Sequence, residues 1–193
     1  MELHEEMLSR LALAEAVARA GGATALSYFS RRDTLVVETK YDLQDVVSIA
    51  DRDVEQMIAA AIREAFPDDG FLGEETGLQA GRTAYTWVVD PIDGTSPFLN
   101  GMPNWCVSVA VLRGDMPIIG VIYAPTFDEC YVAALGEGAT LNGRRLQVDP
   151  ARTLQNHVTG FGANSYVSPQ QVGEIVAALL TAGGNFIRIG SGA

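Results

Sequence analysis

The stretch WVVDPIDGTSPF, residues 87–98, places two carboxylates directly after an apolar run. The apolar residues predict the end of a buried strand. Pro91 predicts that this strand ends at Asp90, because proline has no backbone N–H to donate to a neighbouring strand. The hydroxyl of Thr95, or of the serine after it, can then cap a helix. The stretch therefore predicts a strand-to-helix corner that carries two aspartates.

The same corner has the chemistry of a metal and phosphate site. Carboxylate oxygens such as those of Asp90 and Asp93 are hard ligands for Mg²⁺, and backbone N–H groups at a helix start bind phosphate oxygens. Gly94 permits backbone conformations that other residues resist. One alternative is a turn with two solvated aspartates. Another is the aspartyl-phosphate type of phosphatase, but its Asp-x-Asp spacing differs from the Asp-Pro-Ile-Asp spacing here.

Three ordered motifs carry a resemblance to a known family. DPIDGT, residues 90–95, resembles the signature of the inositol monophosphatase family of Mg²⁺-dependent, lithium-sensitive phosphatases. GEE, residues 73–75, is similar to the family's Gly-Glu-Glu element. KYDLQDVVSIAD, residues 40–51, is similar to its earlier Lys…Val-Thr-x-Ala-Asp segment. The motifs follow one another in the family's order and spacing, over essentially the whole chain.

The resemblance implies an α+β fold, the layered αβαβα sandwich of the inositol monophosphatase and sugar phosphatase type. We expect residues 1–150 to form an N-terminal metal- and phosphate-binding domain. Residues 151–193 would then begin a C-terminal α/β subdomain that is incomplete. The family's later Trp-Asp element, which supplies one more ligating aspartate, is not in this sequence. A truncated chain, a natural short variant and a part of a longer chain all remain open.

The resemblance also implies a set of metal ligands for two or three Mg²⁺ ions. Glu74 and Asp90, with the backbone carbonyl of Ile92, would hold the first ion. Asp90 and Asp93 would hold the second, together with the aspartate that this sequence lacks. Asp51 is a candidate ligand for a further, weaker ion and a candidate catalytic group. The alternative for Asp51 is a helix cap.

The remaining implied roles concern water and phosphate. Glu74 and Thr95 would position the attacking water and take its proton, so no covalent phosphoenzyme is needed. The backbone N–H groups of Gly94 and Thr95, with Asp93, would contact the phosphate or the substrate. Lys40 is a candidate active-site cation, and the alternative is a surface charge. For Thr95 the alternative is a helix cap.

Composition narrows the classes of partner. The formal net charge of −11 disfavours a nucleic-acid polymer or an anionic membrane as partner. Cys106 and Cys130 lie in apolar, strand-like runs, so we expect buried, reduced cysteines in a cytoplasmic protein. The first residues do not resemble a signal peptide, and no apolar run approaches the ~20 residues of a membrane span. His4 and His157 are expected to be surface or packing residues.

Apolar periodicity and turn residues predict the remaining elements. An antiparallel meander is expected to pack on two helices, with a strand–helix–strand unit after it. The expected helices are 3–29, weakened or bent at Gly21-Gly22, 51–65, and 168–182 with Ser168 as its cap. Asn142-Gly143 predicts a hairpin turn. The expected strands are 34–39, 71–75, 85–90, 105–112, 117–123, 129–135, 157–161 and 185–189.

The resulting hypothesis is Mg²⁺-dependent hydrolysis of a small phosphate monoester by an activated water. A small polyol-type monophosphate is favoured, and histidinol phosphate, a sugar bisphosphate and a 3′-phosphonucleotide are alternatives. The family usually has an Asn where Pro97 stands, which leaves the substrate open. A different class of function is a catalytically weak or inactive protein that only binds cations or partners. By resemblance we expect a homodimer.

Overall fold

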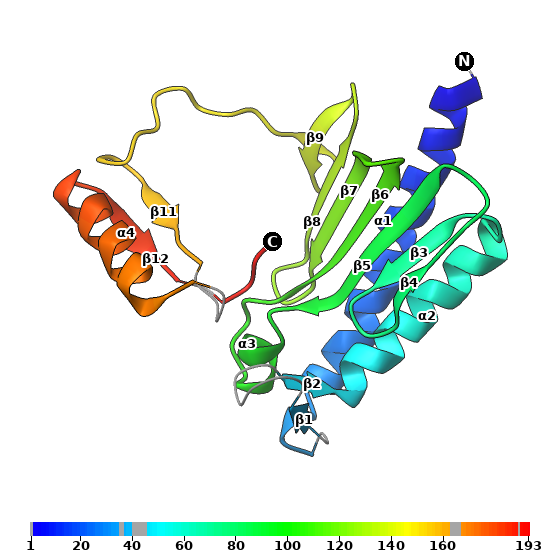
Figure 1. The fold of residues 1–193 in the computed structure, drawn as a ribbon, viewed down its shortest axis with the longest axis horizontal. Coiled ribbons are helices and arrows are strands. Elements are labelled where there is room, and N and C mark those ends of the chain that lie inside the picture. The colour runs from blue at the N-terminus through cyan, green and yellow to red at the C-terminus, as the bar shows by residue number, and fades with distance from the viewer. Residues whose placement is uncertain (1, 35–36, 40–45, 163–166, 189) are drawn as a thin grey trace.

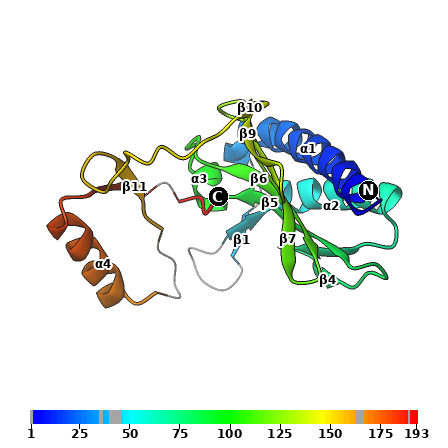
Figure 2. The same cartoon turned by 90° about the horizontal axis from the view of Figure 1, so that it is seen from above.

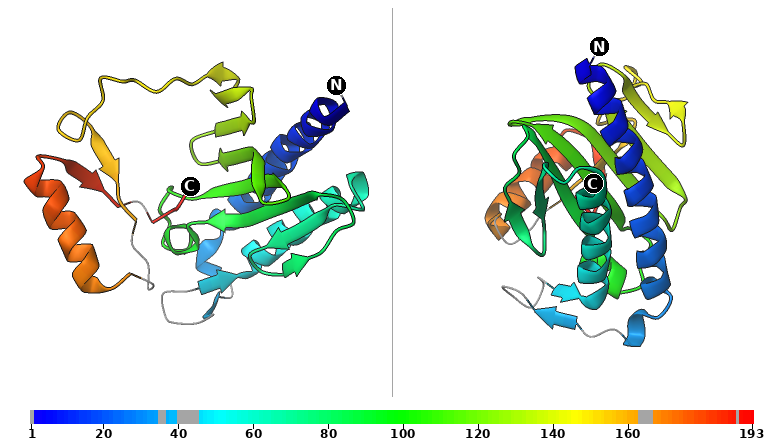
Figure 3. Two further views of the ribbon diagram at one scale, coloured as in Figure 1. Left: turned by 45° about the horizontal axis from the view of Figure 1, so that its top comes forward. Right: turned by 90° about the vertical axis from the view of Figure 1, so that its right-hand side faces the viewer.

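The computed structural model describes residues 2–34, 37–39, 46–162, 167–188 and 190–193 of the chain (Figure 1). Within these residues the fold is mixed, with two long helices on a large sheet and a smaller strand–helix–strand unit apart from them. The two helices are α1 (Glu2–Phe29) and α2 (Ile49–Ala65), and both lie on one face of the sheet (Figure 3).

The large sheet has the strand order β10-β9-β8-β7-β6-β5-β3-β4 among the described residues. β3 runs parallel to β5, and the other neighbouring pairs are antiparallel. The predicted meander is therefore confirmed. The strands are β3 (Gly70–Gly73), β4 (Gly77–Gln79), β5 (Tyr85–Asp93), β6 (Cys106–Arg113), β7 (Met116–Ala124), β8 (Glu129–Ala134), β9 (Gly138–Leu141) and β10 (Arg144–Arg145).

Side-chain alternation puts one face of the sheet into the core. Trp87 and Val89 of β5, and Val107, Val109 and Val111 of β6, are at most 2% exposed. The intervening residues of these strands are half-buried. Because successive side chains of a strand point to opposite faces, the buried set faces the helices. This buried face fixes the register of β5, and thereby the position of its carboxyl end.

α1 continues through Gly21 and Gly22 to Phe29, so the two glycines do not interrupt the helix. A Cβ on Gly21 would lie 2.9 Å from Cδ1 of Ile58 on α2, and a Cβ on Gly22 would overlap the ring of Tyr123 on β7. The two glycines therefore let the helix approach α2 and the sheet closely. Packing at this contact outweighs the low helix propensity of glycine.

The expected strand at 34–39 is only partly correct. Its described strand residues are β1 (Val37–Thr39), which pairs antiparallel with β2 (Val46–Ser48). The short 3₁₀ helix η1 (Arg32–Thr34) takes the place of its beginning. The second helix, expected to begin at Asp51, begins two residues earlier, at Ile49.

The C-terminal unit consists of β11 (Val158–Gly160), α4 (Pro169–Thr181) and β12 (Asn185–Ile187). β11 and β12 pair in parallel. Ser168 caps α4 as predicted, since its hydroxyl accepts a hydrogen bond from the N–H of Gln171, and Pro169 is the first helical residue. The last residues then return to the large sheet beside α3 (Thr95–Leu99) (Figure 2). No helix in the described part of the chain is long and apolar enough to cross a membrane.

Candidate active site at the carboxyl ends of β3 and β5

The strand-to-helix corner forms, but β5 does not end at Asp90 as predicted. It continues through Pro91 to Asp93. Asp90 pairs with Ser108 of β6 and Asp93 pairs with Cys106, so β5 carries one extra residue between the two aspartates. Such a bulge tolerates proline because the extra residue leaves the ladder of hydrogen bonds. Without a bulge, residues three positions apart in a strand would point to opposite faces of the sheet.

Thr95 is the first residue of α3, and the expected cap by Thr95 or its neighbour is wrong. The N-cap position belongs to Gly94, whose φ of 97° and ψ of 42° lie in the left-handed region that favours glycine. The Thr95 hydroxyl instead lies 3.2 Å from the carboxylate of Asp51, to which it donates, and 3.2 Å from the carbonyl of Ile92. A side chain used for capping would not reach these partners.

Asp51 lies in the first turn of α2 and is 1% exposed. Its contact with Thr95 joins residues that are 44 positions apart in the sequence. Two helix N-termini, those of α2 and α3, therefore meet at this carboxylate. Helix N-termini favour negative charge at such a position.

Glu74 lies in the turn after β3, so the expectation that Glu74 and Glu75 are strand residues is wrong. The backbone N–H of Glu74 donates to the carbonyl of Val89 on β5 at 3.2 Å, which holds the turn beside that strand. The Glu74 side chain is exposed and hydrogen-bonds to Asp90. The structure thus brings two of the predicted motifs into direct contact.

The Asp90 carboxyl is crowded by negative charge. Burial, followed by the charges of Glu74 and Asp93, raises the pKa of Asp90 to about 8, and a hydrogen bond from the Ile92 N–H opposes the shift. Two carboxylates in hydrogen-bond contact favour a shared proton. A divalent cation bound to these carboxylates would also remove the repulsion between them, by neutralising their charge.

The chemistry of this donor set fits a hard divalent cation. Three carboxylates and the Ile92 carbonyl are the oxygen ligands that Mg²⁺ prefers. In the described residues, however, no group of three or more His, Cys, Asp or Glu side chains is already arranged to hold a metal ion. The residues that fit the ion are Glu74, Asp90, Ile92 and Asp93. Lys40 lies outside the described residues.

Asp93 is held by the last three residues, which sequence reasoning did not include in the site. Its carboxylate accepts hydrogen bonds from the Ser191 hydroxyl at 2.7 Å and from the N–H groups of Gly192 at 3.0 Å and Ala193 at 2.6 Å. The thiol of Cys106 lies 3.8 Å from the same carboxylate. These residues have no local signal for the site, since only the fold brings them to it.

Cys106 and Cys130 are buried free thiols, as predicted. Burial, followed by the charge of Asp93, raises the pKa of Cys106 to about 12. The Cys106 thiol is therefore neutral at ordinary pH, and it is a poor nucleophile although it lies beside the site. This agrees with a reaction that uses water.

A cavity of about 340 Å³ lies beside Cys106 and Ser191, both of which contact Asp93. Its wall is mostly apolar and comes from β6, β7, β8 and the chain's last residues. The lining residues are Asn104, Trp105, Cys106, Ile122, Ala124, Phe127, Glu129, Tyr131, Ser191 and Ala193.

Comparison with known proteins shows which proteins this chain resembles. A curated Aquifex aeolicus (strain VF5) protein, named fructose-1,6-bisphosphatase/inositol-1-monophosphatase, is 36% identical over 163 residues. The match covers 83% of this chain and 61% of that protein, so the chain spans less than two thirds of this relative's length.

Two solved structures are similar to the fold. The extragenic suppressor protein suhB from Bartonella henselae has a TM-score of 0.89 and 30% identity, over 96% of this chain and 72% of its own. An IMPase of Thermotoga maritima has a TM-score of 0.85 and 30% identity, over 96% and 70% of the two chains. The predicted α+β fold of this type is thereby confirmed. A sequence profile of the inositol monophosphatase family matches residues 6–193, and the chain belongs to that family.

Proposed function

We propose that the protein hydrolyses a small phosphate monoester in an Mg²⁺-dependent reaction, with an inositol monophosphate as the favoured substrate. The observation that carries the proposal is the convergence of three distant motifs at one end of β3 and β5. Thr95 contacts Asp51, and Glu74 contacts Asp90. The family's phosphatases and the name of the Aquifex relative support this class of reaction.

Mg²⁺, when bound, supplies Lewis acidity toward a phosphate oxygen and toward water. The protein's own part is to hold the ligands and the proton acceptors. Asp90, Glu74, Asp93 and the Ile92 carbonyl are the proposed ligands. The dense negative charge at Asp90 makes this place attractive to a cation, since pairing with a cation favours the ionised carboxylates.

The Asp51–Thr95 pair is proposed to handle the proton of the attacking water. Because the Thr95 hydroxyl donates to Asp51, its oxygen lone pairs are left to accept a hydrogen bond from water. The Glu74 side chain is exposed, and it is also proposed to position the attacking water and take its proton. The backbone at Gly94 and Thr95, together with Lys40, is the proposed phosphate contact.

Several finer assignments belong to the same proposal. We propose two or three Mg²⁺ ions, inhibition by lithium, a homodimer and a cytoplasmic location. Asp51 is the proposed ligand of the weakest ion. We also propose that residues 1–150 act as one metal- and phosphate-binding domain, and that 151–193 begin a second one. The chain spans 61% of the length of the Aquifex relative, so the activity is proposed for the whole protein.

The test is phosphate release from a panel of inositol, histidinol, sugar and nucleotide phosphates, with and without Mg²⁺. Asp93→Asn should nearly abolish Mg²⁺-dependent release, because a neutral amide is a weaker ligand. Asp115→Asn, at an exposed turn between β6 and β7, removes the same charge and should leave the rate unchanged. Absence of Mg²⁺-dependent release, or equal rates for Asp93→Asn and the wild type, would contradict the proposal.

A further inference from the structure

Glu55 is a fully buried carboxylate that the proposed chemistry does not use. It lies on α2, one helical turn after Asp51, and is 0% exposed. Its two carboxylate oxygens accept hydrogen bonds from successive backbone N–H groups, that of Glu75 at 2.8 Å and that of Thr76 at 3.0 Å. Both donors belong to the turn that carries Glu74.

Gly73 leaves room for the Glu55 carboxylate. A Cβ on Gly73 would overlap the carboxyl group of Glu55. A glycine just before Glu74 therefore allows the buried side chain of α2 to reach the N–H groups of the turn. The glycine and the glutamate are complementary, although 18 positions separate them in the sequence.

The turn is consequently held from two sides. On one side the Glu74 N–H donates to the Val89 carbonyl of β5, and on the other side Glu55 accepts from the next two N–H groups. Hydrogen bonds to an ionised acceptor are stronger than those between neutral groups. Burying a carboxylate is costly, and these two bonds offset part of that cost.

We propose that Glu55 is a positioning residue, which fixes the turn so that the Glu74 carboxylate meets Asp90 in the metal-binding arrangement. This inference rests on the proposed Mg²⁺ site. One face of α2 then positions both parts of the site, since Asp51 contacts Thr95 and Glu55 holds the turn of Glu74. Glu55 itself touches neither metal nor substrate in this scheme. It acts through Glu74.

The experiment compares crystal structures and Mg²⁺ affinities, measured by calorimetry, of the full chain and its variants. Glu55→Gln keeps the shape but replaces one acceptor oxygen by a donor, so one turn N–H loses its partner. We expect the turn at 74–76 to shift away from Asp90 and the Mg²⁺ affinity to fall 10–100-fold, as for other residues that orient metal ligands. Glu55→Asp keeps the charge but has a shorter side chain, and it replaces Glu55→Gln in the same measurements if Glu55→Gln does not fold.

Two controls separate positioning from simple loss of stability. Val54→Ala is a buried change at the neighbouring residue of α2, which lowers stability without touching the turn. Glu64→Gln removes a charge from the exposed end of the same helix. Both should bind Mg²⁺ as the wild type does, at a temperature at which all variants are folded.

The outcomes are distinct. A turn that is unmoved in the Glu55 variants, or a moved turn with unchanged Mg²⁺ affinity, overturns the inference. If the wild type itself binds no Mg²⁺, the proposed function fails. In that case a larger separation between Glu74 and Asp90 in the Glu55 variants would still support the positioning of Glu74 by Glu55.

Discussion

At the scale of single residues, Asp90 links the geometry of the site to pH. Its pKa in the folded, metal-free protein is about 8, against 3.8 for the free group, so folding favours the protonated carboxyl. The stability that this protonation contributes is fully present below about pH 4 and is lost as the pH rises through about 8. The cause is burial, followed by repulsion from Glu74 and Asp93.

We therefore expect the melting temperature of the metal-free protein to fall as the pH rises from 4 toward 8. Asp90→Asn, which cannot ionise, should weaken this dependence and melt several degrees higher than the wild type at pH 8, while losing Mg²⁺ binding. Calorimetry in the presence of EDTA measures both effects. Parallel melting curves for the two proteins across this pH range would show that Asp90 is not repelled by its neighbours.

The Thr95 hydroxyl gives a second prediction at this scale. Thr95→Ala removes the group that contacts Asp51, and should slow the chemical step by about 10²–10⁴-fold, as for the loss of general acid–base assistance. Mg²⁺ affinity should change little, because Thr95 is not a proposed ligand. Thr95→Ser keeps the hydroxyl and is the matched control. Equal kcat values for the wild type and Thr95→Ala would remove Thr95 from the mechanism.

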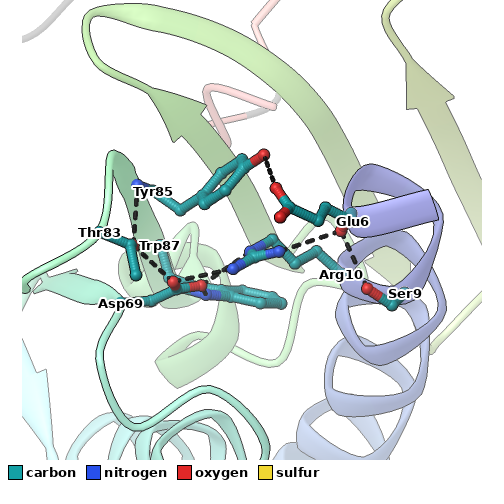
Figure 4. A network of polar contacts seen from close by, with 7 residues as sticks. All are labelled: Glu6, Ser9, Arg10, Asp69, Thr83, Tyr85 and Trp87. Atoms are coloured by element: carbon teal, nitrogen blue, oxygen red, sulfur yellow. Dashed lines mark hydrogen bonds and ion pairs between the residues drawn. The ribbon is translucent and has the colours of Figure 1, made fainter. Parts of the chain in front are cut away.

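At the scale of elements, a second polar network lies where α1 meets the start of β3 and of β5 (Figure 4). The Arg10 guanidinium donates to both carboxylate oxygens of Asp69, at 2.8 and 2.9 Å, and it stacks on the ring of Tyr85, 3.7 Å from its centroid. Asp69 also accepts from the Trp87 indole N–H at 3.0 Å and from the Thr83 hydroxyl at 2.6 Å. The side chains of Arg10 and Asp69 are 7% and 1% exposed.

Burial by itself would raise the pKa of Asp69, but the hydrogen bonds from Arg10, Thr83 and Trp87 outweigh it and lower the pKa below its usual range. The stability from this lowered pKa is present above about pH 4 and is lost as the pH falls through the folded value. The network thus joins α1 to the beginnings of the two parallel strands whose other ends carry Glu74 and Asp90.

Arg10→Met should reduce the free energy of unfolding by about 3–5 kcal/mol, since it leaves the Asp69 carboxylate buried without its cation. Arg19→Met is the matched control on the same helix. Its pair with Glu15 is about two-fifths exposed on both sides, and such pairs contribute only about 0–1 kcal/mol. Urea denaturation measures both values. A loss for Arg10→Met no larger than that for Arg19→Met would show that the network does not anchor α1.

At the scale of the whole molecule, metal binding should couple to stability. A ligand present at about 100 times its Kd stabilises the folded state by about 2.7 kcal/mol, provided that the unfolded chain does not bind it. For a chain of this size each kcal/mol corresponds to roughly 2–4 °C of melting temperature. We therefore expect Mg²⁺ to raise the melting temperature by about 5–10 °C at this concentration, and EDTA to reverse the change.

The control must account for the net charge of −11, because any salt screens the repulsion of so acidic a chain. NaCl at matched ionic strength separates screening from binding, and Asp93→Asn should respond to MgCl₂ only as it does to NaCl. If the wild type melts at the same temperature in MgCl₂ and in NaCl of matched ionic strength, the carboxylates do not bind Mg²⁺.

Prediction from the sequence succeeded where local chemistry decides the structure. The apolar alternation of β6 and β7, the hairpin at Asn142-Gly143 with both φ angles positive, and the Ser168 cap of α4 each depend on a few adjacent residues. It failed where a distant segment decides the conformation. Pro91 does not end β5, because β6 accommodates a bulge, and Thr95 does not cap α3, because its hydroxyl reaches Asp51.

The site divides in the same way. The sequence by itself determined the chemical types of the groups, with Asp51, Glu74, Asp90, Asp93 and Thr95 in recognisable motifs. Glu55 also had a signal, since Asp51 and Glu55 share one helix face with Ile58 and Ile62, at apolar positions. The turn that Glu55 binds could not be predicted in this way, because nothing near Glu55 in the sequence indicates which N–H groups its carboxylate accepts from.

Only the tertiary structure decided which of these groups meet. The Thr95 hydroxyl turns to Asp51 instead of capping its own helix, Glu55 reaches the turn after Gly73, and Ser191 reaches Asp93. Local sequence determines helices and turns because their hydrogen bonds join residues a few positions apart. Burial and charge repulsion depend on every segment that packs around a group, so the environment of a carboxylate is defined only when the chain has folded.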